Sequence, residues 1–277
     1  MVMAIVFEPK EHKYESIDPK DNINWTSVTS CISMFKEPFD ADSIAKKSSK
    51  NKKSKWYGLS PEEIKLRWKQ EGERATKLGS WYHDQREHDV LQLNSITREG
   101  VVLPVFNIKE KDGLKVAPNQ KLTEGIYPEH MVYLKSAGLC GQADRVEVVN
   151  GRVNIYDYKT NKEIKTESYV NWEGISKKMS GPVSHLDDCN YMHYNLQLSI
   201  YMYIILKHNP KLKPGLLAID HIKFKGELDQ YGSRILEYDA NHDPIVDEIK
   251  RYEMPYLKKE VIDIVKYLKK NHDSKTI

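Results

Sequence analysis

Cysteine is scarce in this 277-residue chain, which contains only Cys31, Cys140 and Cys189. Their number is odd, they are widely spaced, and no Cys-x-x-Cys pair occurs, so neither a zinc site nor an iron–sulfur cluster is supported. We therefore expect three packing cysteines in a reducing, cytoplasmic compartment.

Long apolar runs and a strong net charge are also missing. No apolar stretch approaches the ~20 residues of a membrane span. The first nine residues, M-V-M-A-I-V-F-E-P, are too short and uncharged for a signal peptide, and we interpret them as a first strand. A net charge of +3 permits an anionic partner without requiring one. No G-x-x-x-x-G-K-[ST] sequence occurs, so a fused helicase motif is absent.

The most informative pattern lies in residues 141–160. Asn150-Gly151 predicts a two-residue hairpin turn, because a type I′ turn needs positive φ at both central positions. Residues whose numbers sum to 301 then face each other, so Asp144 faces Asp157, and Lys159 shares a strand face with Asp157. The same face is apolar near the turn, where it carries Val146, Val148, Val153 and Ile155.

Two opposed carboxylates destabilise a sheet unless a cation offsets their repulsion. Asp144 and Asp157 offer hard oxygen ligands suited to Mg²⁺ or Mn²⁺, and the backbone carbonyl of Tyr158 is a further candidate ligand. Such an ion can bind a phosphodiester and activate water, while Lys159 orients or deprotonates that water or stabilises the pentacovalent centre. The alternative is a solvated strand end in which Lys159 is a salt-bridge partner.

A lysine-rich segment spans residues 46–55, K-K-S-S-K-N-K-K-S-K, and contains no apolar residue. Its composition predicts a mobile loop or arm. It is either a solvated linker or a phosphate-contacting arm. The lysines concerned are Lys46, Lys47, Lys50, Lys52, Lys53 and Lys55.

Strand and helix patterns alternate along the rest of the chain, which favours a single α/β domain with a central mixed β-sheet flanked by helices and N-terminal helical additions. Expected strands lie within 101–134, in the hairpin, and at 216–224 and 234–238, which should rejoin the sheet. Ser60-Pro61-Glu62-Glu63 begins a helix that Gly72 and Gly79 could divide. Further helices are expected at 81–93, 186–207 and 244–270, and a loop at 161–185. Within this domain we distinguish an N-terminal extension (1–60), a core (61–240) and a C-terminal helix (241–277).

Two helical faces carry further candidates. His193, Gln197 and Tyr201 have the spacing of a single helical face bordering an apolar stripe, where an unpartnered Gln would be costly to bury. Gln197 and Tyr201 could lie beside the metal site and bond phosphate or order water; the alternative is an ordinary amphipathic helix with an exposed Gln. His83 and Glu87 likewise share a face.

Four motifs together resemble the PD-(D/E)xK nuclease superfamily, in particular its RecB-like exonuclease branch. G79-S-W-Y-H83 resembles the Gly-Thr-x-x-His motif, with Ser80 in place of Thr, and G141-Q-A-D144 resembles Gly-x-x-Asp. D157-Y-K159 is similar to the Asp-x-Lys core, and Q197-L-S-I-Y201 resembles Gln-x-x-x-Tyr. The flanks are similar to mitochondrial genome maintenance exonuclease-like proteins and phage-encoded relatives, and there Glu129 matches a family Glu.

The resemblance implies roles for these residues. Asp144 and Asp157 would bind the catalytic metal, Lys159 would be catalytic, and His83 would be an accessory metal ligand. Gln197 and Tyr201 would support the site. The cysteines that clamp an iron–sulfur cluster in some relatives are missing, so that element should be absent. Accessory candidates are Glu87, Glu129 and His193.

The resulting hypothesis is a Mg²⁺- or Mn²⁺-dependent DNA nuclease with a restriction-endonuclease-like core, most consistent with an exonuclease acting on linear or single-stranded ends. Alternatives are a structure-specific endonuclease, an inactive nucleic-acid-binding subunit, and a different metal hydrolase or structural protein. The pattern suggests no membrane association. It suggests a phage or mobile-element setting in the host cytoplasm, with a recombination, repair or replication protein as a partner.

Overall fold

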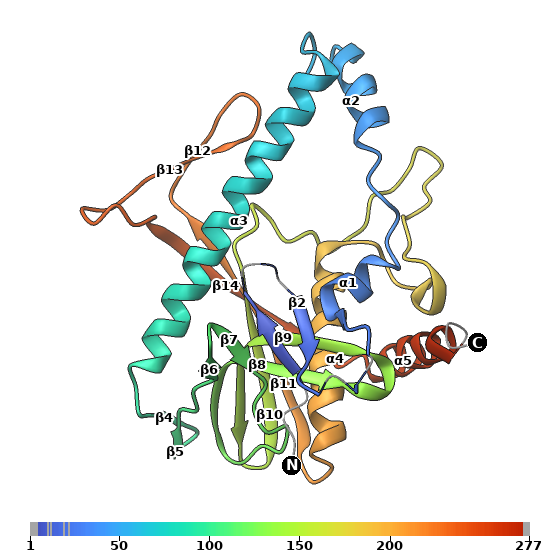
Figure 1. Cartoon of the computed structure of the whole chain (residues 1–277). Helices are drawn as coiled ribbons and strands as arrows, with labels where there is room; N and C mark the ends of the chain where they lie inside the picture. Colours follow the sequence, from blue (N-terminus) through green and yellow to red (C-terminus); the bar gives the residue numbers. More distant parts are fainter. Residues whose placement is uncertain (1–4, 10, 12, 19, 22, 274–277) are drawn as a thin grey trace.

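A central mixed sheet organises the computed structural model, which describes residues 5–9, 11, 13–18, 20, 21 and 23–273 (Figure 1). The strand order is β14-β11-β10-β9-β3, with β8 also paired to β9. β10 and β11 are parallel and are joined through helix α4 (Asn190–His208), whereas β9 is antiparallel to both of its neighbours β8 and β10. The bounds are β3 (Thr26–Ser27), β8 (Gly125–Leu134), β9 (Leu139–Val149), β10 (Arg152–Lys159), β11 (Lys213–Phe224) and β14 (Val246–Met254). The predicted fold class is thereby confirmed.

The β9–β10 hairpin has the predicted register. Asn150 and Gly151 have φ values of 50° and 69°, as a type I′ turn requires. Residue numbers sum to 301 at every pair from Val149–Arg152 to Arg145–Tyr156. The ladder ends there, so Asp144 and Asp157 lie immediately beyond the last pair.

Along one edge of β9 the neighbouring strand changes from β3 to β10. The two carboxylates lie at the gap between these neighbours. β8 pairs with one edge of β9 between Leu139 and Val148. On the opposite edge, β3 pairs with Leu139 and Cys140, and β10 pairs only from Arg145 onward. Within the described part of the chain, Gly141–Asp144 therefore has no strand beside it on that edge.

α4 covers one face of the sheet and α5 (Lys258–Asp273) packs against α4, and the main core combines buried residues of the sheet with those of both helices. The four predicted apolar hairpin residues, Val146, Val148, Val153 and Ile155, are 0% exposed. Burying each such side chain contributes about 1.5–3 kcal/mol, which firmly ties the hairpin to α4. The three cysteines are buried and free, as expected for packing residues. No helix among the described residues is long and apolar enough to cross a membrane.

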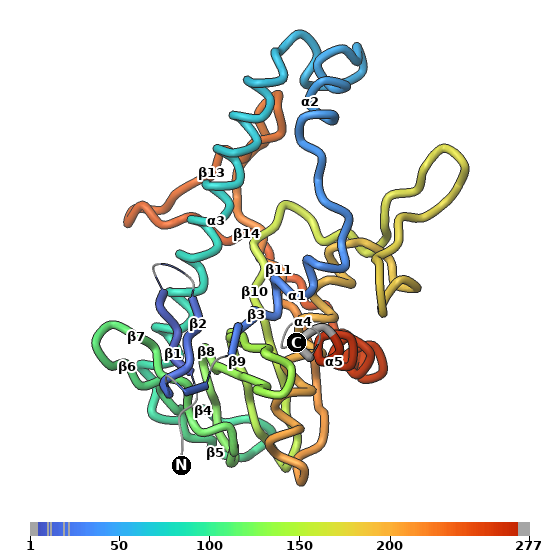
Figure 2. Tube along the Cα trace, turned by 45° about the vertical axis from the view of Figure 1, so that its right-hand side comes forward, coloured from blue at the N-terminus to red at the C-terminus, as the bar shows by residue number. Residues whose placement is uncertain are grey.

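Residues 28–91 form an arch that leaves the sheet and returns to it. The chain rises from α1 (Val28–Ser33) to α2 (Ala41–Lys50) and comes back along α3 (Pro61–Leu91), as both views show (Figures 1 and 2). α3 begins with a capping box in which Ser60 and Glu63 satisfy each other's backbone N–H groups. Its 31 residues correspond to a length of about 46 Å.

The remaining strands form small sheets outside the central one. A four-stranded sheet has the order β2-β1-β7-β6, and two pairs stand apart. Their bounds are β1 (Ile5–Glu8), β2 (Lys13–Ser16), β4 (Ser95–Arg98), β5 (Val101–Pro104), β6 (Lys109–Lys111), β7 (Leu114–Val116), β12 (Gly226–Leu228) and β13 (Arg234–Leu236). Two short 3₁₀ turns cover Lys135–Ala137 and Gly181–Val183.

Two secondary-structure predictions in the N-terminal third, a division of α3 and a loop at its preceding lysines, were wrong. Gly72 and Gly79 do not divide α3, because a helical Gly costs only about 1 kcal/mol relative to Ala and the many turns around it outweigh that. Residues 46–50 are not a loop but the end of α2, whose start is capped by the Asp40 side chain and whose Ala45 is buried.

Two predictions in the C-terminal third were also wrong. Residues 246–254 form the edge strand β14, and the C-terminal helix begins only at Lys258. β14 carries charges on an exposed edge, a pattern that resists pairing with other chains and that does not alternate clearly enough to distinguish it from a helix. β13 pairs with β12 alone and does not rejoin the central sheet.

Candidate active site

Three potential metal ligands from three elements converge where β9 lacks its neighbour. His83 of α3, Glu129 of β8 and Asp144 of β9 each offer one ligand atom, and these atoms lie within 4.8 Å of one another. His83 Nδ1 lies 3.2 Å from Asp144 Oδ2, and its Nε2 lies 3.1 Å from the Tyr158 carbonyl oxygen. An imidazole and two carboxylates are a donor set that divalent ions accept. The predicted Asp157 is outside this group, and the Tyr158 carbonyl contacts His83.

Glu129 reaches the group through an unusual backbone conformation. The β8–β9 ladder pairs Pro128 with Arg145 and His130 with Ala143, so Glu129 lies opposite Asp144. Its φ is 48°, in the left-handed region, which for a residue other than glycine costs on the order of 1–3 kcal/mol. Burial, and then the charges of Asp144 and Glu87, raise the pKa of Glu129 well above its usual value.

Asp157 and Lys159 form a buried pair next to this group. Lys159 Nζ lies 2.5 Å from Asp157 Oδ2, and the Asp157 side chain is 2% exposed. Burial and the charge of Asp144 raise the pKa of Asp157 to about 6. Burial acts to lower the pKa of Lys159, but Asp157 and Asp144 raise it to about 12.

The buried oxygens of Asp157 bear on whether the residues fit a metal ion. Despite the short ion pair, neither oxygen accepts a hydrogen bond of good geometry from the described residues. A buried carboxylate in this condition is rare and requires a compensating partner. A cation close to both Asp157 and the three converging ligands would supply one, so the donor set fits a divalent metal.

The charges of Asp144 and His83 support each other. Burial acts to raise the pKa of Asp144, but His83, Lys159 and the Tyr158 N–H, which donates to Oδ2 at 2.7 Å, lower it overall. Burial acts to lower the pKa of His83, but Asp144 raises it to about 9. In the metal-free protein His83 therefore acts as a cation that holds Asp144 ionised.

Gln197 and Tyr201 are buried on α4, at 8% and 2% exposure, so the alternative of an exposed Gln is excluded. Gln197 Nε2 donates to the Tyr201 hydroxyl at 3.2 Å. The Tyr201 ring packs under Gly141, where a Cβ atom would lie 2.7 Å from Tyr201 Cε1. The glycine of one motif and the tyrosine of another are thus in contact.

Replacing Gly141 with alanine should lower the free energy of unfolding by about 1–3 kcal/mol, because the added methyl group overpacks the Tyr201 ring. Nuclease activity should fall as well, since the ring must shift beside Asp144. Urea unfolding and cleavage assays measure both effects. Gly72→Ala is the control: nothing lies within 4 Å of its added Cβ, and it should stabilise α3 by about 0.5–1 kcal/mol. Unchanged stability of Gly141→Ala would contradict the close packing.

Other predicted residues lie apart from the ligand group. His193 Nε2 lies 2.7 Å from Asp188 Oδ1 instead of facing the carboxylates. Glu87 pairs with Lys115 at 3.6 Å. Its charge contributes to the raised pKa of Glu129. The six lysines of 46–55 are exposed on the end of α2 and on the turn that follows it.

Tyr194 is a site residue that the sequence analysis missed. Its ring centroid lies 5.0 Å from Lys159 Nζ, and its hydroxyl donates to Asn161 Oδ1 at 2.8 Å. A cation over an aromatic face is attracted to it, so Tyr194 helps hold the ammonium group in place. Its position three residues before Gln197, on the same side of α4, would have indicated it.

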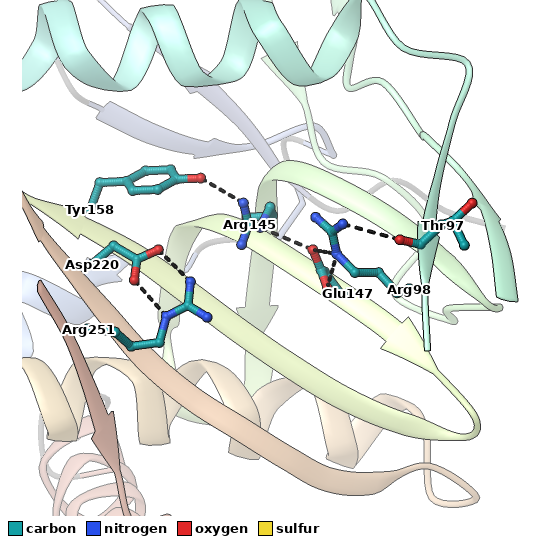
Figure 3. Close-up of polar contacts among 7 residues, drawn as sticks. All are labelled: Thr97, Arg98, Arg145, Glu147, Tyr158, Asp220 and Arg251. Carbon is teal, nitrogen blue, oxygen red and sulfur yellow. Dashed lines mark hydrogen bonds and ion pairs between the residues drawn. The ribbon is translucent and has the colours of Figure 1, made fainter. Parts of the chain in front are cut away.

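A network of arginines and acids lies on the opposite face of the same strands (Figure 3). Glu147, 1% exposed, contacts Arg98 and Arg145, and Arg145 Nη1 donates to the Tyr158 hydroxyl at 2.9 Å. Arg251 forms a two-point pair with Asp220, at 2.7 and 2.8 Å. Such pairs are geometrically specific, and they hold β9, β10 and β11 in position on the face that points away from the metal ligands.

Comparison with known proteins agrees with this geometry. The family model described as the PD-(D/E)XK nuclease superfamily matches residues 44–270, most of the chain. The chain belongs to the PD-(D/E)xK nuclease superfamily. The matched segment includes every residue from His83 to Tyr201 described above, and the mixed sheet is consistent with a restriction-endonuclease-like core. Membership implies a nuclease with DNA as substrate and divalent metal as cofactor. Neither a curated protein nor a solved structure matched the chain.

Proposed function

We propose that this PD-(D/E)xK nuclease is a Mg²⁺- or Mn²⁺-dependent DNA exonuclease of the RecB-like branch that acts on linear or single-stranded ends. The observation that carries the proposal is the convergence of His83, Glu129 and Asp144 beside the buried Asp157–Lys159 pair. Hard oxygen ligands with one imidazole suit these two metals. The same proposal includes three further points. The protein is cytoplasmic, it has a single nuclease domain, and it acts with a partner protein in recombination, repair or replication.

The side chains divide the work according to their charge. Asp144, Glu129, His83 and Asp157 would hold the ion, which when bound supplies Lewis-acid activation of the phosphodiester. Lys159, with a pKa of about 12, is protonated at neutral pH. It therefore acts as a donor to the phosphate oxygen on which charge develops, rather than as a base. Gln197 and Tyr201 orient the phosphate or the attacking water beside Lys159.

The arch supports a preference for ends. The two ends of the arch lie on either side of the site. Val28 at the start of α1 lies next to Gly141, and His83 in the last third of α3 contacts Asp144. The chain between them spans from α1 through α2 to α3 (Figure 2). We infer that the DNA strand enters between these two segments, which a free end can do and a closed circle cannot unless the segments separate.

Cleavage of end-labelled linear DNA and of closed circular DNA, each single- and double-stranded, tests the proposal. We expect Mg²⁺- or Mn²⁺-dependent loss of linear DNA alone, no loss with EDTA, and no loss with Asp157→Ala. Asp84→Ala, an exposed carboxylate next to His83 on α3, is the matched control and should retain activity. Cut circles would make the protein an endonuclease. Absence of cleavage with either metal would favour an inactive DNA-binding subunit.

The lysines at the far end of the arch should contact DNA phosphates. Replacing Lys46, Lys47 and Lys50 with glutamine should weaken DNA binding and reduce the slope of log affinity against log salt by up to about 2, since each contact to a single strand contributes about 0.7. Fluorescence anisotropy at several salt concentrations measures both. Replacing Lys259, Lys266 and Lys269 of α5 removes the same charge from a different surface. Equal slopes in the two triple variants would make the 46–55 segment a plain linker.

A further inference from the structure

A groove of about 680 Å³ lies along α3, between this helix and the segment of β13 with the turn that follows it. It is outside the arch. Figure 1 shows the β12–β13 ribbon on one side of α3 and the limb that rises from α1 to α2 on the other. The catalytic side chain of α3, His83, does not line the groove.

The lining combines flat apolar surfaces with cations. Trp81, Leu236 and Tyr238 contribute apolar surface, and the Tyr238 side chain is 55% exposed. Arg74 and Lys77, both exposed, stand on the helix rim. Aromatic rings that stack on bases, together with cations that track phosphates, are the recognition chemistry of single-stranded nucleic acid.

Three cations, Arg74, Lys77 and Arg234, line the groove against two acidic residues. The groove also contains Glu71 and Asp243. Glu71 is paired with Lys162, 2.5 Å away, so its charge is already compensated. Arg234, which also lines the groove, donates to the Thr160 carbonyl at 2.6 Å and so connects the groove wall to the end of the catalytic strand.

α3 separates the groove from the site. A Cβ atom at Gly79 would contact Thr160 Oγ1 at 3.5 Å, so the helix rests on the chain that leaves β10. At 100° per residue, Arg74, Leu78 and Trp81 project about 100–160° away from the direction of Gly79. A strand lying in the groove is thus on the other side of the helix from the strand at His83.

We propose that this groove binds the uncleaved strand of a DNA end whose two strands have separated, with bases against Tyr238 and Trp81 and phosphates on Arg74 and Lys77. The proposal rests on the proposed function and specifies its substrate as a duplex end or fork. One strand of this DNA is cleaved at the site, and the other lies in the groove on the opposite side of α3. Charge complementarity favours this occupant over a protein segment.

Charge reversal in the groove tests the proposal. Arg74→Glu combined with Lys77→Glu is measured in an Asp157→Ala background for binding and in the otherwise wild-type enzyme for cleavage. Affinity for a duplex with two unpaired tails should fall by at least about tenfold at moderate salt, and the salt slope should fall by about 1.4. Affinity for a plain single strand and its rate of cleavage should be unchanged.

Two controls keep the test specific. Lys259→Glu with Lys269→Glu gives the same change in net charge on α5 and should leave fork binding unchanged. Tyr238→Ala should weaken fork binding about tenfold, whereas Tyr238→Phe, which keeps the ring, should not. Circular dichroism and thermal unfolding verify that each variant is folded.

The outcomes separate the two proposals. Unchanged fork affinity in the Arg74/Lys77 variant would overturn the groove assignment, and so would an equal loss of affinity for the plain single strand. If the wild type cleaves no DNA but the groove variant still loses fork binding selectively, the exonuclease proposal fails and the groove assignment stands.

Discussion

Replacing Lys159 with methionine should lower the rate of DNA cleavage by about 10²–10⁴-fold while DNA affinity is retained. Methionine keeps much of the side-chain volume beside Tyr194 but removes the ammonium that lies 2.5 Å from Asp157. The loss should appear in kcat, because the charge is needed where negative charge develops on the phosphate. Single-turnover cleavage and anisotropy binding separate the two quantities.

The same substitution leaves Asp157 without its cation. The pKa of Asp157, already raised by burial, should rise further, so the carboxyl takes up a proton and the fold is kept. Urea unfolding should therefore remain cooperative. Lys165→Met is the control, since this exposed lysine pairs with the exposed Glu163 on the surface. Failure of Lys159→Met to fold would make Lys159 a structural counter-ion, and retained cleavage in a folded variant would remove it from the chemistry.

The hairpin that carries Asp144 and Asp157 was predictable from sequence because its information is local. Asn150-Gly151 fixes the turn, the turn fixes the register, and alternation then assigns each side chain to a face. The end of α4 was predictable for a similar reason: Asn209 and Pro210 follow the last helical residue directly. In both places neighbouring residues determine the conformation.

The ligand group depended on contacts that no local pattern specifies. Glu129 meets Asp144 only because β8 pairs with β9 and bends at a left-handed residue. His83 reaches the Tyr158 carbonyl across 75 residues of sequence. His193 has the helical spacing of Gln197 and Tyr201, but Asp188, two residues before α4 begins, binds its imidazole. Four motifs in order identified the superfamily, yet the set of converging atoms required the tertiary structure.

Metal affinity should depend steeply on pH, because the ligands bind protons in the metal-free protein. An imidazole must be neutral to coordinate, and His83 has a pKa of about 9. Below that pH, binding through His83 releases one proton, so affinity should fall about tenfold for each unit of decreasing pH. Below about pH 6, Asp157 is protonated as well and should steepen the fall if it coordinates. Affinity thus increases with pH, and the contribution of His83 levels off above about 9.

Calorimetric titration of Mn²⁺ in buffers of different ionisation enthalpy measures the released protons directly. The wild type should release more protons near pH 7.5 than His83→Gln, and its affinity should rise more steeply with pH. Asp144→Asn should abolish specific binding, since this ligand is the one held ionised by His83 and the Tyr158 N–H. Equal proton release by wild type and His83→Gln would show that His83 does not coordinate the metal and acts only as the cation that keeps Asp144 charged.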